Sequence, residues 1–371
     1  MHSPKFSRLA RALPNSVPFV GPEALERQRG SGFLARLGAN ESGFGPSPRV
    51  TNALQNAASS IWMYGDPECI DLRTALAAHH KTTLENIVAG EGIDGLLVVL
   101  ARLFVSEGDA VVTSLGAYPT FDFHILGSGG ILHRAPFLGD HEDPDALVTL
   151  AHQVAPKLLY LSNPNNPMGS FHSGAKIEAM IDALPQDTLL VLDEAYSELA
   201  PKETIPHIDP NDPRVIRMRT FSKAYGLAGL RVGYAISAPQ VIKGFERLRN
   251  HFGLGRLAQT GALAALEDQS YLAKVVQDVA QARHTIAQIA TDNGLIPLTS
   301  GANFVAIDCG QDGDFAFRIL TYLAQEGIFV RKPGIAPQNR TIRVSVGPKD
   351  AIDFLRSALP LALQRAKDSK L

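Results

Sequence analysis

Lys223 lies in the segment RTFSKAYGLAGLRVGY (219–234), directly after a run of residues typical of a buried strand. Asp193 and Asn166 end two further runs of this kind, LVLDEAYSE and LYLSNPNNPMG, and Tyr196 follows Asp193 closely. Ligands of an open α/β sheet bind outside the carboxyl ends of its strands, so we expect these side chains to meet in one crevice. A lysine beside a carboxylate, an amide and a phenol is suited to form a Schiff base with an aldehyde cofactor.

Pyridoxal phosphate is an aldehyde cofactor whose requirements match these residue types. It needs a lysine linkage and a carboxylate facing its ring nitrogen. Asp193 would keep that nitrogen protonated, so that the ring accepts electrons. Asn166 and Tyr196 can hydrogen-bond the phenolic oxygen of the ring. Donors for the phosphate are expected close in sequence to Lys223, at Thr220, Ser222 and Arg231.

The segment GEGIDG (90–95) is a further candidate phosphate site, because it fits GxGxxG between an apolar run and a helical run. A dinucleotide site would need an acid about 20 residues later, at the end of the second strand. Glu107 and Asp109 have this spacing but precede the strand AVVTS, which leaves an NAD-dependent dehydrogenase as a distant alternative. A helix N-terminus holds any phosphate through its free N–H groups. We expect this role for Gly92, Ile93 and Asp94.

Short apolar runs alternate with helical stretches from about residue 45 to about residue 250, which predicts a mostly parallel sheet sandwiched by helices. The predicted strands are NIVAG, DAVVTS, GILHRA, KLLYLSNP, TLLVLDE, VIRMRT and RVGYAIS. After residue 265, a long helical segment ending at Gly294 and fewer strands predict a smaller α/β domain. We expect three parts: an N-terminal arm over 1–45 that packs with the small domain, a large cofactor-binding domain over 46–260, and a small C-terminal domain over 261–371.

Composition excludes several other classes of protein. The formal net charge of −2, from 35 basic and 37 acidic residues, implies no attraction to nucleic acid or to a membrane surface. No apolar run is long enough to span a bilayer. The two cysteines, Cys69 and Cys309, form no C-x-x-C motif, which favours a reducing, cytoplasmic location. The histidines form no metal-binding pattern, so no metal is expected.

The segments PNNPMG, DEAYSEL and SKAYGLAGLRVGY, in this order, resemble the pyridoxal-phosphate-dependent aminotransferases of fold type I, class I/II. The resemblance is strongest to the histidinol-phosphate aminotransferase branch. Asn166 to Asp193 spans 27 residues (193 − 166), and Asp193 to Lys223 spans 30 (223 − 193). The resemblance implies an α/β fold with a large and a small domain, pyridoxal 5'-phosphate as cofactor, amino-acid and 2-oxo-acid substrates, and a homodimer.

The resemblance also implies roles for single residues. Phe121 in AYPTFDF matches an aromatic residue that stacks on the cofactor ring. Tyr64 in WMYGDPE matches a tyrosine that crosses a dimer interface to the partner's cofactor phosphate. Arg343 in TIRVSVG matches the arginine that binds the substrate α-carboxylate. Substrate contacts are thus expected from Arg343, from Arg331 in IFVRKPG as a second arginine, and from Asn166. The segment PFVGPEALE resembles an arm that helps to close the site.

The expected reaction is a transamination in two halves with ping-pong kinetics. The amino donor displaces Lys223, whose freed amine then moves a proton as general base and acid. Met168 and the glycine-rich segment RNHFGLGRLAQ (249–259) depart from the family pattern, which leaves the donor open between histidinol phosphate and an aromatic amino acid. The acceptor would be a 2-oxo acid such as 2-oxoglutarate. A decarboxylase or lyase of the threonine-phosphate decarboxylase type is the main alternative, and a cofactor-sensing regulator is a further one.

Overall fold

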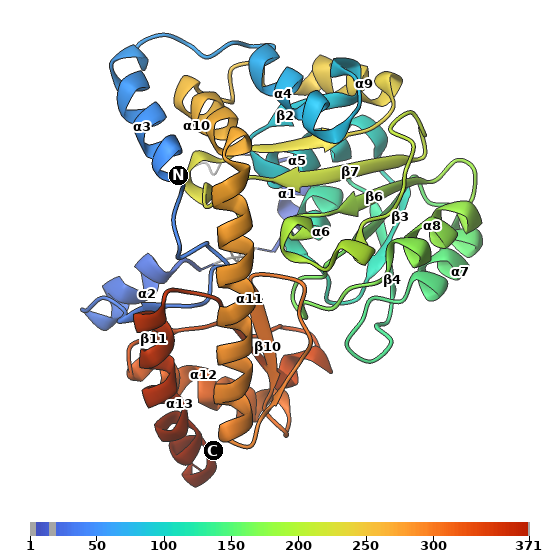
Figure 1. Cartoon of the computed structure of the whole chain (residues 1–371). Coiled ribbons are helices and arrows are strands. Elements are labelled where there is room, and N and C mark those ends of the chain that lie inside the picture. The colour runs from blue at the N-terminus through green and yellow to red at the C-terminus, as the bar shows by residue number, and fades with distance from the viewer. Residues whose placement is uncertain (1–4, 15–19, 370–371) are drawn as a thin grey trace.

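The computed structural model describes residues 5–14 and 20–369, and Figure 1 shows two bodies joined by the long helix α11 (Gln269–Asp292). The upper body in this view holds the larger sheet, and the lower body holds most of the C-terminal third of the chain. In the expected closing segment PFVGPEALE, residues 18 and 19 lie outside the described residues. Helix α2 (Pro22–Arg29) begins within that segment and lies beside the lower body.

Within the described residues, seven strands form the larger sheet, in the order β2-β8-β7-β6-β5-β3-β4. Each of the seven strands predicted from the sequence is present. The strands from β7 to β4 in this order are parallel, whereas β8 pairs antiparallel with both β7 and β2. The sheet is therefore mostly parallel, as expected. The bounds are β2 (Ile87–Gly90), β3 (Ala110–Ser114), β4 (Ile131–Ala135), β5 (Leu158–Ser162), β6 (Leu189–Asp193), β7 (Val215–Thr220) and β8 (Gly233–Ile236).

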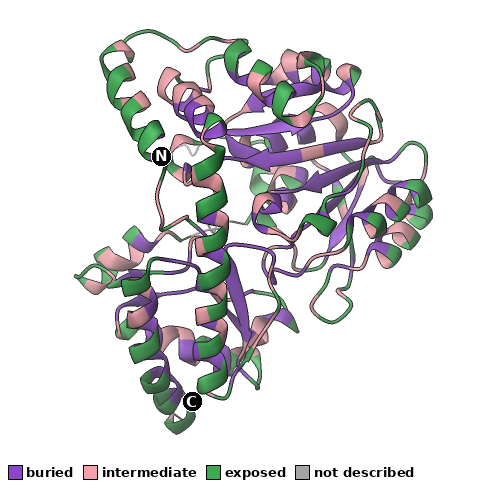
Figure 2. Ribbon diagram, in the orientation of Figure 1, coloured by how far each residue is buried: buried purple, intermediate pink, exposed green. Residues whose placement is uncertain are grey.

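Helices cover both faces of this sheet, and its central strands are buried (Figure 2). Successive residues of a strand point to opposite faces. Val111 and Leu158 pack on one face, under α5 (Gly92–Phe104), α6 (Pro119–Gly127) and α9 (Pro239–Leu248). Val112 and Leu159 pack on the other, under α7 (Pro144–Val154) and α8 (Gly174–Ala183). Beside β2 and β8, that second face is covered by α3 (Pro48–Ala57), α4 (Ile70–His80) and α10 (Arg256–Glu267).

The small domain is built on an antiparallel sheet of three strands in the described chain, ordered β12-β10-β9. The arm joins this domain, because β1 (Ala35–Arg36) pairs with β11 (Ile328–Phe329) and Leu37 is buried in the same core. Residues 35–37 of the arm therefore contact the core that contains the three-stranded sheet. Further bounds are β9 (Ile296–Pro297), β10 (Phe304–Asp308), β12 (Thr341–Ser345), α12 (Gly313–Gln325) and α13 (Lys349–Asp368).

The expected end of the large domain at residue 260 falls inside α10, a single helix that packs against α3 and α4. We therefore propose that the large domain continues through Glu267. The break after it carries no glycine or proline, the usual signals of a helix end. It is made by Asp268, whose side chain accepts a hydrogen bond from the backbone N–H of Tyr271 and so begins α11.

The described residues contain neither a membrane-spanning helix nor a metal-binding cluster. Over 5–14 and 20–369, no helix is long and apolar enough to cross a membrane. The same residues contain no group of three or more His, Cys, Asp or Glu side chains placed to hold a metal ion.

Candidate active site

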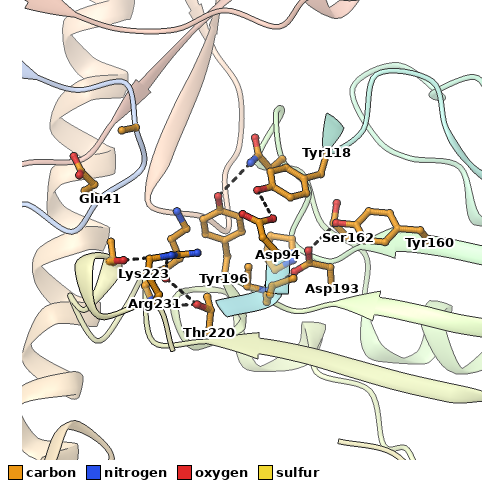
Figure 3. Close-up of a pocket in the computed structure, with 17 residues that line it drawn as sticks. Glu41, Asp94, Tyr118, Tyr160, Ser162, Asp193, Tyr196, Thr220, Lys223 and Arg231 are labelled. Carbon is orange, nitrogen blue, oxygen red and sulfur yellow. Dashed lines mark hydrogen bonds between the residues drawn. The ribbon is translucent and has the colours of Figure 1, made fainter. Parts of the chain in front are cut away.

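A cavity of about 260 Å³ lies at the carboxyl ends of β5, β6 and β7, opposite the first turn of α5. Figure 3 shows Lys223, Arg231 and Thr220 on one side of it and Asp193, Tyr160 and Tyr118 on the other. The sequence placed its candidates at strand ends, and the fold brings most of them to this one cavity. Those that line it are Ile93, Asp94, Asn166, Asp193, Tyr196, Thr220, Ser222, Lys223 and Arg231.

Lys223 follows β7, and its side chain is held inside the cavity. Its Nζ donates a hydrogen bond to the carbonyl oxygen of Asn40 at 3.0 Å and lies 5.7 Å from the ring centre of Tyr196. Burial, reinforced by the positive charges of Arg343 and Arg231, lowers the pKa of Lys223 to about 8. Near neutral pH, a larger fraction of this amine is therefore neutral than in an ordinary lysine, and the neutral amine is the nucleophile and the base.

Asp193 ends β6 and is buried. Its Oδ2 accepts a hydrogen bond of 2.7 Å from the hydroxyl of Tyr160, and its Oδ1 accepts one of 3.0 Å from the backbone N–H of Ala195. Burial raises the pKa of Asp193 to about 6, because these two neutral donors only partly replace the lost hydration. A protonated ring nitrogen is a cation that such a carboxylate would bind, so the site fits this requirement of pyridoxal phosphate.

Arg343 reaches the same region from β12 of the small domain. Its Nη1 donates to Asn166 Oδ1 at 2.6 Å, and its Nη2 donates to the carbonyl oxygen of Gly38 at 3.1 Å. Its Nε is buried and has no hydrogen-bond partner in the described part of the chain. Burial lowers the pKa of Arg343 to about 10, so it remains a cation at neutral pH. A buried cation with an unused N–H is a suitable receptor for a substrate anion.

The N-terminus of α5 forms a candidate phosphate-binding site. Gly92 has a φ of +76°, and a Cβ at this position would lie 2.6 Å from Nη2 of Arg231. Glycine is therefore required for the guanidinium to lie against the helix N-terminus. Nη1 of Arg231 donates to Ser222 Oγ at 3.3 Å, and Thr220 Oγ1 donates to the same oxygen at 3.0 Å. Backbone N–H groups, a guanidinium and two hydroxyls thus converge, as a phosphate requires.

The topology does not fit the dinucleotide alternative. In a dinucleotide-binding fold, the glycine motif follows an inner strand that is parallel to its neighbours. Here the motif follows β2, which is an edge strand and pairs antiparallel with β8. The GxGxxG pattern therefore marks the start of a helix that can bind a phosphate. It is not part of the parallel βαβ unit that binds a dinucleotide.

Phe121 does not have the position expected of it. Its side chain is 1% exposed and stacks on the ring of Tyr160, with 4.4 Å between ring centres, so it belongs to the core. Tyr118 lines the cavity instead and donates a hydrogen bond of 3.0 Å to Asp94 Oδ1. The physical reason is the start of α6 at Pro119: the residue before it faces the cavity, whereas Phe121 lies within the first turn and points to the sheet.

Tyr64, Arg331 and Arg343 are not among the residues that line the cavity within the described chain, although Arg343 contacts the lining residue Asn166. Tyr64 is 78% exposed and packs on the ring of Phe252, 4.9 Å between ring centres. Arg331 pairs through its backbone with Arg343, and its Nη2 donates to the carbonyl oxygen of Val20 in the arm at 2.7 Å. The two arginines are thus neighbours, and the charge of Arg331 contributes to the lowered pKa of Arg343.

Sequence reasoning missed several residues of the site, among them Tyr118, Tyr160 and Asn40. Tyr160 carried a signal, because it is the one aromatic residue in the strand LLYLS and a buried hydroxyl needs a partner. Asn40 carried none, since its partners Tyr196 and Lys223 lie more than 150 residues away in the chain.

Comparison with known proteins identifies the class. Residues 34–359 match the model of the family Aminotransferase class I and II, and the chain belongs to this family. Histidinol-phosphate aminotransferase of Moorella thermoacetica is 32% identical over 352 residues, which cover 93% of this chain and 90% of that protein. The crystal structure of histidinol-phosphate aminotransferase from Sinorhizobium meliloti in complex with pyridoxal-5'-phosphate is 50% identical, with a TM-score of 0.95, and covers 98% of this chain and 99% of that one.

A more distant structure shows the fold alone. Aspartate aminotransferase from Thermus thermophilus with maleate is 22% identical, with a TM-score of 0.81 over 98% of this chain and 100% of that one. The predicted fold class is therefore confirmed: the chain has the α/β fold of the pyridoxal-phosphate-dependent transferases of fold type I.

Proposed function

We propose that this chain is a pyridoxal-phosphate-dependent aminotransferase that moves an amino group between histidinol phosphate and a 2-oxo acid such as 2-oxoglutarate, in amino-acid biosynthesis. The observation that carries the proposal is the shared cavity of Lys223, Asp193 and the helix start at Gly92. The choice of donor is supported by similarity to the two histidinol-phosphate aminotransferases, of 32% and 50% identity.

When bound, pyridoxal phosphate supplies an aldehyde for the lysine and a ring that accepts the electron pair of the substrate α-carbon. Asp193 would hold the proton on the ring nitrogen, and Tyr118 would contact the ring. Asn166 and Tyr196 would hydrogen-bond its phenolic oxygen. The first turn of α5 would bind the phosphate together with Thr220, Ser222 and Arg231.

Lys223 has two tasks in this reaction. Its neutral amine would condense with the cofactor aldehyde, with loss of water, and so hold the cofactor between turnovers. Once displaced by the amino donor, its Nζ would move a proton away from the substrate α-carbon. Its lowered pKa suits both tasks. Arg343 orients the substrate through its anionic group, so that the α-hydrogen faces Lys223. A second substrate, a 2-oxo acid, is bound by the same arginine and takes up the amino group.

A panel of donors with 2-oxoglutarate tests this function. Histidinol phosphate, phenylalanine, tyrosine and aspartate would each be supplied at several concentrations, and glutamate formation would be measured. We expect the highest kcat/KM for histidinol phosphate and no sustained turnover without the 2-oxo acid. Sustained turnover without an acceptor would instead indicate the decarboxylase or lyase alternative.

Arg331 is proposed to contribute to donor choice. Histidinol phosphate carries a dianionic phosphate, and glutamate carries a second carboxylate, whereas phenylalanine has a single negative charge. Because Arg331 lies beside Arg343, it would add a second positive charge for the dianions. We expect Arg331→Ala to lower kcat/KM about tenfold or more for histidinol phosphate and to change that for phenylalanine little.

The matched control is Lys332→Ala, which removes a neighbouring cation whose Nζ bonds only the carbonyl oxygen of Pro333 among the described residues. For both donors, kcat/KM of this variant should equal that of the unmodified enzyme. An equal loss for histidinol phosphate and phenylalanine in Arg331→Ala would contradict the role proposed for Arg331.

A homodimer is proposed from the surface around Tyr64. Ile61, Trp62, Tyr64 and Phe252 are exposed by 65%, 80%, 78% and 53%, and exposed apolar groups gathered in this way favour a protein partner. A second copy of the chain would cover them, and Tyr64 would then reach the cofactor phosphate of the partner.

Mixed dimers test this arrangement. Differently tagged chains carrying Tyr64→Ala and Lys223→Ala would be combined, and the heterodimer purified by both tags. One of its two sites then has both residues intact, so about half the activity of the unmodified dimer should return. No recovery above the two parent variants, or an active monomer by sedimentation, would contradict the arrangement.

The cytoplasm is the proposed location. Cys69 and Cys309 are buried thiols that form no disulfide, as is usual in a reducing compartment. The proposed partners are small-molecule substrates and the second copy, without nucleic acid or membrane.

A further inference from the structure

Asn40 lies in the segment that joins the arm to α3, at the junction of the two domains. It is 2% exposed and has a φ of 56°, the left-handed region that asparagine enters more readily than most residues. Its carbonyl oxygen accepts hydrogen bonds from Lys223 Nζ at 3.0 Å and from Asn303 Nδ2 at 2.9 Å. Asn40 is thus a buried residue with a rarely occupied backbone conformation, and its carbonyl oxygen contacts the catalytic lysine. This combination indicates a role within the site.

The orientation of the Asn40 side-chain amide is fixed by Ser345 on β12. The backbone N–H of Asn40 can only donate, and it donates to Ser345 Oγ at 3.0 Å. The Ser345 hydroxyl donates its own proton to Asn40 Oδ1, at 2.8 Å. With Oδ1 used in this way, Nδ2 must be the atom that faces Tyr196, and it donates to the Tyr196 hydroxyl oxygen at 3.1 Å.

A second amide approaches the same oxygen with an equally fixed orientation. Arg343 can only donate, so the Asn166 atom that it contacts at 2.6 Å is the oxygen Oδ1. Asn166 Nδ2 then donates to the Tyr196 hydroxyl oxygen at 3.4 Å. A hydroxyl oxygen has two lone pairs and one proton. With both lone pairs engaged, the proton of Tyr196 must point elsewhere, and Tyr196 lines the cavity.

We propose that Asn40 is a positioning residue that makes the Tyr196 hydroxyl a hydrogen-bond donor into the cavity, toward the phenolic oxygen of the cofactor. The inference rests on the proposed function. It assigns Asn40 a part in tuning the cofactor, beyond the roles of Tyr196 and Lys223. Asn40 is hydrogen-bonded to Ser345, which follows Arg343 by two residues on β12. This bond connects the Tyr196 hydroxyl, through Asn40, to the strand proposed to bind the substrate anion.

The charges around Tyr196 are compatible with this role. Burial raises the pKa of Tyr196 to about 12, while the cation Arg343 and the donor Asn40 lower it and the carboxylate Asp193 raises it. Lys223 lies over its ring. The phenol therefore keeps its proton across the working pH range and has it available to donate.

The visible absorption of the holoenzyme, titrated with pH, is the readout. A donor to the phenolic oxygen stabilises the negative charge on that oxygen, so the Lys223–cofactor linkage loses its proton at lower pH. In Asn40→Asp, the carboxylate accepts the Tyr196 proton and removes it from the cavity. We expect the midpoint of the absorption change to rise by about one pH unit or more, as it should in Tyr196→Phe.

Combining the two substitutions separates the effect of the Tyr196 hydroxyl on the midpoint from the effect of the negative charge that Asn40→Asp introduces. In the Tyr196→Phe background the hydroxyl is absent, so Asn40→Asp should add only a small shift. Asn40→Gly keeps the left-handed backbone and the carbonyl oxygen that receives Lys223, and removes only the amide. It should shift the midpoint in the same direction by a smaller amount. Ser42→Ala is the control from the same segment, because its Oγ has no hydrogen-bond partner among the described residues, and its midpoint should not move.

Three results would overturn the inference. They are an unchanged midpoint in both Asn40 variants, an equal shift by Asn40→Asp with and without the Tyr196 hydroxyl, and no shift in Tyr196→Phe itself. Failure of the proposed function is distinct from all of these, because the unmodified protein would then not acquire the absorption of a bound cofactor.

Discussion

Lys223→Ala is expected to abolish turnover and to remove the yellow colour of the purified protein. In the proposed reaction, this residue supplies the amine that binds the cofactor and the base that moves the substrate proton. Loss of a general base alone costs about 10²–10⁴-fold in rate, and here the covalent role is lost as well. We therefore expect a decrease in kcat of about 10⁴-fold or more, measured with saturating histidinol phosphate and 2-oxoglutarate.

Two further variants sharpen this test. Lys223→Arg keeps a positive charge, but a guanidinium remains protonated and cannot form the linkage, so it should be equally inactive. Lys176→Ala removes an exposed lysine that pairs with Asp145 far from the cavity, and it should behave like the unmodified enzyme. A colourless unmodified protein that cannot be reconstituted with pyridoxal phosphate, or an active Lys223→Ala variant, would falsify the assignment.

The pH dependence of cofactor capture follows from the same residue. The pKa of Lys223 is lowered to about 8, so the amine is protonated below this pH and neutral above it. Only the neutral amine attacks an aldehyde. Capture of pyridoxal phosphate by the apoprotein should therefore accelerate as the pH rises to about 8 and change little above it.

The strands and the central site residues were predictable because their signals are local. Each strand of the large sheet is a short apolar run, and Asn166, Asp193 and Lys223 each follow one of them within a few residues. Strand ends of a parallel sheet lie on one edge, so three local patterns sufficed to predict one crevice. The order of the strands could be known only from the structure, which also shows that β2 is an edge strand.

The parts that could not be predicted depend on contacts across the chain. Phe121 and Tyr118 are both aromatic and only three residues apart, and the start of α6 decides which of them faces the cavity. Asn40 looks like any loop asparagine until Ser345 and Tyr196 are placed beside it. The break between α10 and α11 could not be predicted, because an aspartate cap, rather than a glycine or proline, separates the two helices.

Arg343→Lys is the second substitution with a large expected effect. Arg343 uses Nη1 for Asn166 and Nη2 for Gly38, and its Nε is buried without a partner in the described chain. A guanidinium can keep these contacts and still present an N–H edge to an anion, whereas a lysine has a single nitrogen and cannot copy the planar fork. Disrupting a buried charge pair on one side typically costs ~2–5 kcal/mol. KM should therefore rise more than tenfold for every donor and every 2-oxo acid.

The comparison with Arg331 and with a distant arginine makes this prediction specific. Arg331→Ala should affect dianionic substrates selectively, whereas Arg343→Lys should affect phenylalanine, histidinol phosphate and 2-oxoglutarate alike. Phenylalanine and 2-oxoglutarate carry a carboxylate on the reacting carbon, and histidinol phosphate carries its phosphate one methylene and one oxygen away, where the same arginine would bind it. Arg340→Lys is the control: Arg340 pairs with Asp140 and Asp308 and does not line the cavity, so KM should stay within about twofold. If Arg343→Lys left KM unchanged for phenylalanine while raising it for histidinol phosphate, Arg343 would be a specificity residue and another residue would have to be the common anion receptor.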